Sequence, residues 1–376
     1  MAGIYLHIPF CKKACHYCDF HFSTSLQQEL PVIHAMEREL ELRKSFLHEP
    51  IETIYFGGGT PSLLQPERIS LLLDAIYTRF PISQQPEITL EANPDDVSPA
   101  RALAWKKAGI NRISLGVQSF QPHWLEWMNR AHNAEQSLQA ITELQTAGFE
   151  NISIDLIYGM PEQTDAAWQE EIQKAIELQV THLSCYALTV EPRTALWHMI
   201  EKGKTVTIDP DQQARMFLML MDGLEKAGYE HYEISNFAKP GKRSRHNSAY
   251  WRGTTYLGIG PAAHSFDGSR RMWNINNNST YTSQIEAGVL PLTEETLSTN
   301  EHWNEYIMTA IRTKEGISLK RIAVQFGEEK REQLLKQTAT WLKRNLLQHV
   351  DDHLQLTREG KLLADQIASD LFQIAE

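Results

Sequence analysis

The chain has 376 residues, of which 36 are basic and 47 acidic, and its formal net charge at pH 7 is −11. This acidic balance argues against a nucleic-acid-binding surface, and the hydrophobic fraction of 42% is that of an ordinary globular protein. The sequence opens without a charged-then-apolar leader and has no apolar run near the ~20 residues of a membrane span, so we expect a cytoplasmic protein; peripheral membrane association stays open.

From residue 4 to about residue 190, short β-rich runs alternate with helical stretches. Strands are expected at 4–8, 53–56, 87–91, 112–117, 152–157 and 182–188. Helices are expected between them at 29–46, 67–79, 99–107, 135–146 and 166–178. This alternation predicts an α/β fold with parallel strands and right-handed crossovers, either an open doubly wound sheet or a curved partial barrel.

The middle of the chain, up to residue 293, is less regular. An amphipathic helix is expected at 211–226, further strands at 229–237 and 256–266, and a polar loop at 274–278. We therefore expect three segments, with boundaries at 1–204, 205–293 and 294–376.

The last of these segments is predicted to be mostly helical and winged-helix-like. Its pattern is helix, helix, hairpin and helix, at 319–326, 329–345, 346–356 and from Thr357 onward. A DNA-binding module of this kind would carry basic residues on its wing, whereas the tip here is Asp351-Asp352-His353. A packing or lid module is therefore favoured over nucleic-acid binding.

Three of the four cysteines, Cys11, Cys15 and Cys18, follow the first predicted strand with the spacing C-x3-C-x2-C. Thiolates this close can converge on one metal centre, and three ligands leave one iron of a four-iron cluster open. The alternatives are unrelated core cysteines, a disulfide framework, or a zinc site completed by His16 or His21. The polar neighbours of the cysteines, their odd number and the lack of a distant second pair favour an iron–sulfur cluster.

Together with three further motifs, this spacing resembles the radical S-adenosylmethionine (SAM) superfamily. The motifs are Phe-Gly-Gly-Gly-Thr-Pro-Ser at 56–62, Gly-Val-Gln-Ser at 116–119 and His-Asn-Ser-Ala-Tyr-Trp at 246–251. They are similar to the branch that contains oxygen-independent coproporphyrinogen III oxidase and the heme chaperone family HemW, and the resemblance covers nearly the whole chain. It implies a partial (β/α)6 barrel, open on one side, with a [4Fe-4S] cluster on the three cysteines.

The resemblance also implies a set of SAM contacts, most of them at the carboxyl ends of the predicted strands. They are Tyr5, Tyr17, Gly58, Gly59, Thr60, Glu91, Gln118, Arg130, Asp155, Ala187 and His264. Taken alone, the glycine run is a tight turn and Glu91 a solvated strand end. Asp155 lies within an apolar strand and must be paired or face a cavity, and we expect Arg130 to be its partner.

The string His246-Asn247-x-x-Tyr250-Trp251 is typical of the heme chaperones. A histidine beside two aromatic side chains can ligate heme iron while the rings pack on the macrocycle. Without the resemblance, a turn capped by Asn247 with core aromatics is the simpler interpretation.

Two departures from the oxidase favour the chaperone family. Phe20 stands where the oxidase carries a further cysteine, and the oxidase's long segment ahead of the cluster is absent. We therefore expect a protein that binds heme and transfers it to heme-accepting proteins, served by an electron donor. The alternative is an oxidase that decarboxylates coproporphyrinogen, and coproporphyrinogen dehydrogenase activity is expected to be absent.

Overall fold

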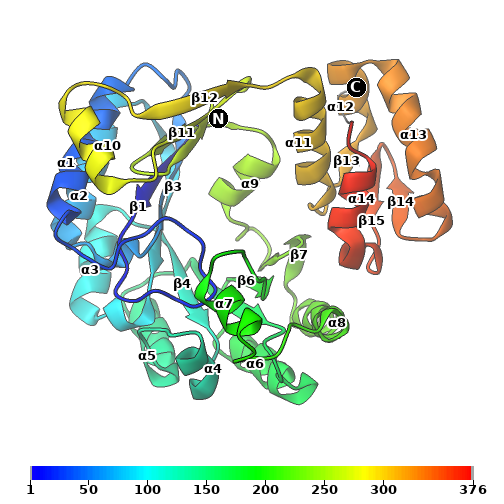
Figure 1. The fold of residues 1–376 in the computed structure, drawn as a ribbon, viewed down its shortest axis with the longest axis horizontal. Helices are drawn as coiled ribbons and strands as arrows, with labels where there is room; N and C mark the ends of the chain where they lie inside the picture. The colour runs from blue at the N-terminus through cyan, green and yellow to red at the C-terminus, as the bar shows by residue number, and fades with distance from the viewer. Residues whose placement is uncertain (1, 374–376) are drawn as a thin grey trace.

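The structure is a computed structural model that describes residues 2–373, so residue 1 and residues 374–376 of the predicted terminal segments lie outside it. Six parallel strands, hydrogen-bonded in chain order, form its centre (Figure 1): β1 (Ala2–Ile8), β2 (Ile51–Gly58), β3 (Ile82–Ala92), β4 (Arg112–Gln118), β5 (Ile152–Tyr158) and β6 (His182–Ala187). The helices of the crossovers cover the outer face of the curved sheet: α1 (Glu29–Leu42), α2 (Pro66–Arg79), α3 (Pro99–Ala108), α5 (Ala134–Thr146) and α6 (Asp165–Glu177). The predicted partial barrel is confirmed.

Strand β1 shows how the sequence builds this sheet. Ile4, Leu6 and Ile8 are fully buried, and each contributes about 1.5–3 kcal/mol by leaving water. Because side chains alternate across a strand, Tyr5 and His7 share the opposite face. The outer face of β1 thus packs the helices, and its inner face is free for polar chemistry.

Further strands extend both edges of the barrel into one twelve-stranded sheet. Next to β1 lie β9 (Thr255–Ile259), β10 (His264–Phe266), β11 (Arg270–Asn274) and β12 (Leu292–Thr296). Next to β6 lie β8 (Asn236–Ala238) and β7 (Glu230–Glu233). Strand β9 runs parallel to β1 and is a seventh parallel strand that the alternation did not predict.

The two long strands expected at 229–237 and 256–266 are wrong, because each is broken by a turn into two strands. In the first, the Glu233 carboxylate accepts a hydrogen bond from the Ser235 N–H and caps the turn between β7 and β8. In the second, Gly260 and Ala262 take the left-handed conformation around a proline (φ 106° and 60°).

The remaining helices are α4 (Pro122–Trp127), α7 (Ala195–Glu201), α8 (Pro210–Lys226), α9 (Arg245–Trp251) and α10 (Asn278–Glu286). The expected loop at 274–278 is wrong at its two ends. Asn274 closes β11, and the Asn277 side chain accepts a hydrogen bond from Thr280 N–H and so caps α10. No helix among residues 2–373 is long and apolar enough to cross a membrane.

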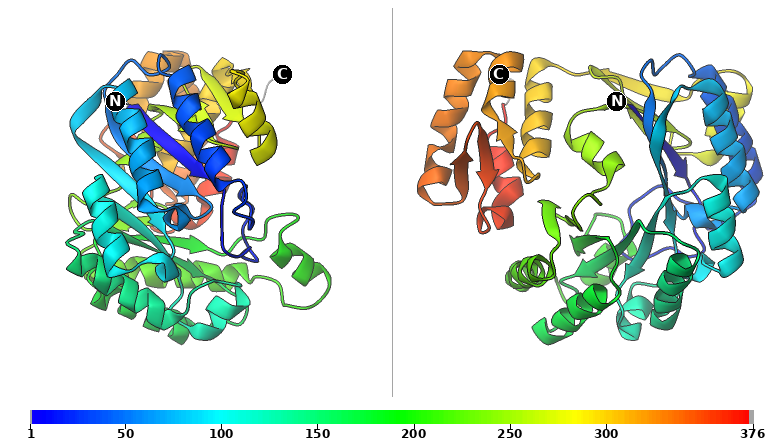
Figure 2. Two further views of the ribbon diagram at one scale, coloured as in Figure 1. Left: turned by 90° about the vertical axis from the view of Figure 1, so that its left-hand side faces the viewer. Right: turned by 180° about the vertical axis from the view of Figure 1, so that it is seen from behind.

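The C-terminal part has its own hydrophobic core and lies beside the barrel, with α9 in between (Figures 1 and 2). It contains α11 (Thr299–Ile311), β13 (Ile317–Ser318), α12 (Leu319–Phe326), α13 (Glu328–Lys343), β14 (Leu347–Val350), β15 (His353–Leu356) and α14 (Ala364–Asp370). The three strands pair in the order β13-β15-β14, which confirms the winged-helix-like expectation.

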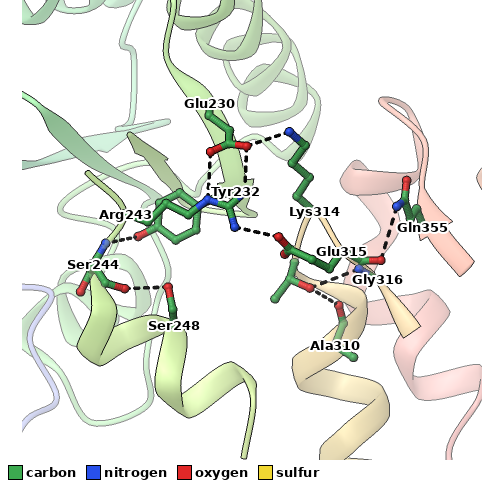
Figure 3. Close-up of polar contacts among 11 residues, drawn as sticks. Glu230, Tyr232, Arg243, Ser244, Ser248, Ala310, Lys314, Glu315, Gly316 and Gln355 are labelled. Atoms are coloured by element: carbon green, nitrogen blue, oxygen red, sulfur yellow. Dashed lines mark hydrogen bonds and ion pairs between the residues drawn. The ribbon is translucent and has the colours of Figure 1, made fainter. Parts of the chain in front are cut away.

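A cluster of charged side chains joins the barrel to this C-terminal part (Figure 3). Arg243 binds the Glu230 carboxylate through two nitrogens at 2.9 and 2.8 Å, and its third nitrogen reaches Glu315 at 2.7 Å. Lys314 also contacts Glu230, at 2.7 Å. These two cations lower the pKa of Glu230 to about 2.

Replacing Arg243 by methionine should lower the free energy of unfolding by roughly 1–2 kcal/mol at pH 7, because a bidentate, half-buried contact is lost. Since the folded pKa of Glu230 is depressed, its contribution exists above its unfolded pKa near 4.3 and is lost as the pH falls toward 2. Denaturant unfolding should therefore show a gap between wild type and R243M at pH 7 that closes near pH 2. Arg331→Met, which breaks one exposed pair within α13, is the control, and an equal loss in both variants would contradict the prediction.

Candidate functional site

The carboxyl ends of the barrel strands open into one cavity of about 770 Å³, which we call the barrel cavity. Twelve of the predicted cluster and SAM residues line it: Cys11, Cys15, Cys18, Tyr17, Gly58, Gly59, Thr60, Glu91, Gln118, Arg130, Asp155 and Ala187. Apart from Arg130, which follows α4, they come from the loop after β1 and from the carboxyl-terminal parts of β2 to β6 and the residues directly after them, as expected for a site at the carboxyl edge of parallel strands. The structure brings them together; their individual roles stay predictions.

The cysteine loop is fixed by backbone contacts to distant parts of the chain. Cys11 N–H donates to the Ser23 carbonyl at 3.0 Å, which closes the loop on itself. His16 N–H donates to the Met128 carbonyl at 3.1 Å, and Leu196 N–H donates to the His16 carbonyl at 2.7 Å. The loop is thus held from both sides by segments that follow β4 and β6.

The chemistry of this donor set fits an iron–sulfur cluster. The three thiols are half-buried on one cavity, Arg130 donates a hydrogen bond to Cys15 Sγ at 3.3 Å, and Thr60 donates one to Cys11 Sγ at 3.5 Å. A nearby cation and hydrogen bonds to sulfur favour thiolates. Burial raises the pKa of the Cys18 thiol to about 11, and coordinated iron would reverse that shift.

Each of the two histidines considered for the zinc alternative has one ring nitrogen engaged away from the cysteines. His16 Nδ1 lies 2.6 Å from the Trp127 carbonyl oxygen, and His21 Nε2 lies 2.8 Å from Asn278 Oδ1. Within residues 2–373, no three His, Cys, Asp or Glu side chains converge on a single metal-ion position, and the three cysteines need not do so in a four-iron cluster, because each would bind a different iron. The fourth cysteine, Cys185, is buried in the core on β6, as expected.

The glycine run at the end of β2 permits a close approach that larger residues would prevent. A Cβ on Gly59 would lie 2.7 Å from the Phe10 carbonyl oxygen and 2.9 Å from that of Ile8. A Cβ on Gly58, whose φ is 108°, would meet the His7 ring at 2.7 Å. The run is therefore shaped by the β1 end and cysteine loop that it packs against.

Glu91 ends β3 and is tied to its neighbours through both carboxylate oxygens. It accepts a hydrogen bond from the Tyr55 hydroxyl at 2.8 Å and one from Gly58 N–H at 3.1 Å. Burial raises its pKa to about 7. Glu91 is therefore not a freely solvated residue at a strand end, because its carboxyl group is hydrogen-bonded at the wall of the barrel cavity.

Glu91→Gln should make the chain more stable at pH 8 and leave it unchanged near pH 4. In the wild type the unfolded state loses this proton from about pH 4.5, whereas the folded state keeps it until about 7, so stability falls as the pH rises. A gap of 2.5 pKa units corresponds to roughly 3 kcal/mol by pH 8. Denaturant unfolding of both proteins between pH 4 and pH 8 measures it, and a difference independent of pH would contradict the assignment.

The expected ion pair between Arg130 and Asp155 is wrong. The guanidinium of Arg130 instead donates to Cys15, to Asn93 Oδ1 at 2.5 Å and to the Gly116 carbonyl at 3.0 Å. Asp155 faces the barrel cavity, accepts from the Ser114 hydroxyl at 3.4 Å, and has its pKa raised by burial to about 6. Arg130 therefore contacts the cysteine loop, whereas the sequence predicted that it would contact Asp155.

Sequence reasoning missed the wall that the C-terminal part adds to the barrel cavity. Arg312, Lys361 and Asp365 line the cavity together with the cysteine loop. Lys361 Nζ lies 2.9 Å from His231 Nδ1 on β7, and burial lowers the lysine pKa to about 8. No local sequence motif predicts that these residues line the cavity, although a packing or lid module was the favoured interpretation of the C-terminal segment.

The motif His246-Asn247-x-x-Tyr250-Trp251 forms helix α9 rather than a turn, and Ser244, not Asn247, caps it. His246 is only 2% exposed. Its Nδ1 lies 2.8 Å from Thr53 Oγ1 and its Nε2 lies 2.9 Å from the Tyr250 hydroxyl. The structure therefore places His246 in the core with both ring nitrogens engaged, and its expected heme ligation stays a prediction that this arrangement does not favour.

Tyr5 and His264, the two other expected SAM contacts, do not line the barrel cavity. They line a second cavity of about 960 Å³ together with Tyr250, and we call it the edge cavity because β9 to β11 border it. His7, which was not singled out from the sequence, also lines it, and so does His21, which was considered only as a zinc ligand. The alternation of β1, which puts His7 on the face of Tyr5, was the available signal.

Comparisons with known proteins agree with this geometry. The family model of the radical SAM superfamily matches residues 5–175, and that of the HemN C-terminal domain matches residues 297–363. The solved structure of coproporphyrinogen III oxidase from Escherichia coli, a radical SAM enzyme, superimposes with a TM-score of 0.85 at 24% identity, over 99% of this chain and 90% of that one. That likeness supports the fold.

Relatives that match nearly the whole chain identify the family within the superfamily. The heme chaperone HemW of Mycobacterium tuberculosis is 36% identical over 98% of this chain and 94% of its own length. The heme chaperone HemW of Bacillus subtilis is 34% identical over 98% of both chains. The chain belongs to the heme chaperone HemW family of the radical SAM superfamily.

Proposed function

We propose that this protein binds heme and transfers it to heme-accepting proteins, and that it carries a [4Fe-4S] cluster and SAM in the barrel cavity. The full-length similarity to heme chaperones carries the proposal. A second observation supports it, since the edge cavity offers the histidine and aromatic side chains that a porphyrin needs.

The chain's own residues would serve the two cofactors as follows. Cys11, Cys15 and Cys18 would hold the cluster, and Arg130 would orient Cys15. The Glu91 carboxylate would accept hydrogen bonds from the ribose hydroxyls of SAM. When bound, the cluster and SAM supply one-electron chemistry, while the protein supplies position and excludes water.

The expected binding partners and cellular location follow from the chemistry of the cluster. An electron donor would be needed to reduce the cluster, and a reducing compartment such as the cytoplasm would keep its thiolates intact. Heme-accepting proteins are the expected recipients.

An anaerobic assay separates the chaperone from the oxidase. The reconstituted protein is incubated with coproporphyrinogen III, SAM and a reductant, and in parallel loaded with heme and mixed with an apo-heme protein. We expect heme to pass to the acceptor and no protoporphyrinogen to form. Phe20, at the position of the oxidase's additional cysteine, favours this outcome; protoporphyrinogen formation would overturn it.

A further inference from the structure

The edge cavity contains an imidazole whose two nitrogens have no hydrogen-bond partner among the described residues, that of His264. We propose that the edge cavity holds the iron porphyrin and that His264 is the axial ligand of its iron. This inference rests on the proposed function, because it assigns the site at which heme binds. It gives His264 a role other than the SAM contact that the resemblance implied.

The position of His264 is fixed by its backbone while its side chain stays exposed. It begins β10, where its partner across the strand pair is Trp273 on β11. Its carbonyl oxygen lies against Gly258 of β9, where any Cβ would collide with it. The imidazole lies parallel to the Trp273 ring, with centroids 6.0 Å apart and an interplanar angle of 24°. A rigid backbone thus presents a free ring to the cavity.

Of the other imidazoles near the cavity, two have both ring nitrogens engaged and the third, that of His21, has one. His7 has its Nε2 2.9 Å from the His21 carbonyl oxygen and its Nδ1 3.2 Å from the Tyr5 hydroxyl. His21 uses Nε2 to contact Asn278. His246 is buried with both nitrogens engaged, but it holds the Tyr250 hydroxyl, and Tyr250 lines the edge cavity. The family motif would therefore act by positioning Tyr250 rather than by ligating iron.

The remaining walls suit a flat aromatic ligand. Tyr250 and Tyr256 meet edge to face, with centroids 4.6 Å apart, and Leu290 and Leu292 add aliphatic surface. A cavity of about 960 Å³ is at the upper end of the range of ~300–1,000 Å³ usual for small-molecule sites. Porphyrins are among the largest such ligands, so the volume and the lining agree.

Arg271 lies near His264, but it lines the neighbouring cavity of about 560 Å³ and its guanidinium is paired with the Glu305 carboxylate. Arg271 lies two residues before Trp273 on β11 and therefore on the same face of the strand. Burial, and secondarily the charge of Arg271, lower the pKa of His264, which keeps the imidazole neutral and able to ligate a metal at pH 7.

The edge cavity adjoins the cysteine loop. Asp19 and Phe20, directly after Cys18, line both it and the barrel cavity. Phe20 is 66% exposed, so its ring is available to pack on a ligand. This shared wall would place the heme beside the cluster rather than in the SAM pocket.

The test is heme titration of the anaerobically reconstituted full chain, followed by the Soret and visible bands. His264→Ala should shift the Soret band and raise the Kd for hemin at least about tenfold, and added imidazole should restore the wild-type spectrum. His302→Ala is the matched control, because His302 lines a neighbouring cavity of about 560 Å³ that also includes Tyr250 and Trp251. His246→Ala should change affinity but keep the ligand field.

Each outcome decides between assignments. The assignment of His264 is overturned if the spectrum of H264A is unchanged. It is also overturned if H302A or H246A loses the wild-type spectrum while added imidazole fails to restore that of H264A. Absence of hemin binding by the wild type would instead reject the proposed function, so the two failures are distinguishable. His264 is exposed, and an unchanged melting temperature of H264A should show that the fold is intact.

Discussion

Cys15→Ala should yield a nearly colourless protein with more than a tenfold loss of cluster iron and acid-labile sulfide after anaerobic reconstitution. The three thiols of the cysteine loop are the predicted ligands, and Cys15 additionally receives the hydrogen bond of Arg130 at 3.3 Å. Two thiolates cannot hold a four-iron cluster against exchange with solvent as three can. Iron and sulfide analysis with the visible spectrum measures the loss.

The matched control for Cys15→Ala is Cys185→Ala. Cys185 is a buried core residue of β6, so its truncation removes little more than a sulfur atom from the core and should leave iron and sulfide at wild-type levels. Full cluster content in C15A, or equal loss in both variants, would exclude Cys15 as a ligand.

Gly59→Ala is expected to have the second largest effect, a loss of roughly 3 kcal/mol in unfolding free energy together with loss of the cluster. The new Cβ would meet the backbone oxygens of Phe10 and Ile8 at 2.7 and 2.9 Å, and backbone cannot rotate away as a side chain can. Gly59 N–H donates to Ile8 at 2.9 Å, so the collision would separate β2 from the start of the cysteine loop. Denaturant unfolding and iron content measure the two losses.

Gly203→Ala controls for the change of glycine to alanine itself. Gly203 has φ 64°, and a Cβ added there would meet no atom within 4 Å, so the variant should lose only about 1 kcal/mol, from conformation, and keep its cluster. If G59A retained its cluster and lost no more stability than G203A, the close packing of the glycine run would not matter to the site.

The sequence predicted those features that depend on residues close together in the chain. The C-x3-C-x2-C spacing, the glycine run after β2 and Glu91 at the end of β3 each sit where a strand ends. Parallel strands bring such ends to one edge, so the barrel cavity follows once the strands are recognised. The hairpin of the C-terminal part follows likewise from its turn residues.

Partners that are chosen in three dimensions could not be predicted this way. Arg130 is 115 residues from Cys15, and its preference for the sulfur over Asp155 depends on how the segment after β4 reaches the loop. The engagement of His246 by Thr53 of β2 spans 193 residues and has no local signature. The turn at Gly260, which places His264 on the edge cavity, was hidden within an apparently continuous strand.

Spectroscopy of protein isolated without oxygen tests the central claim most directly, namely that three cysteines hold a cluster with one iron open to SAM. Metal and sulfide analysis should give about four irons and four sulfides per chain, and the electron paramagnetic resonance signal of the reduced cluster should change when SAM is added. Zinc in place of iron, iron without sulfide, or a signal indifferent to SAM would contradict the account.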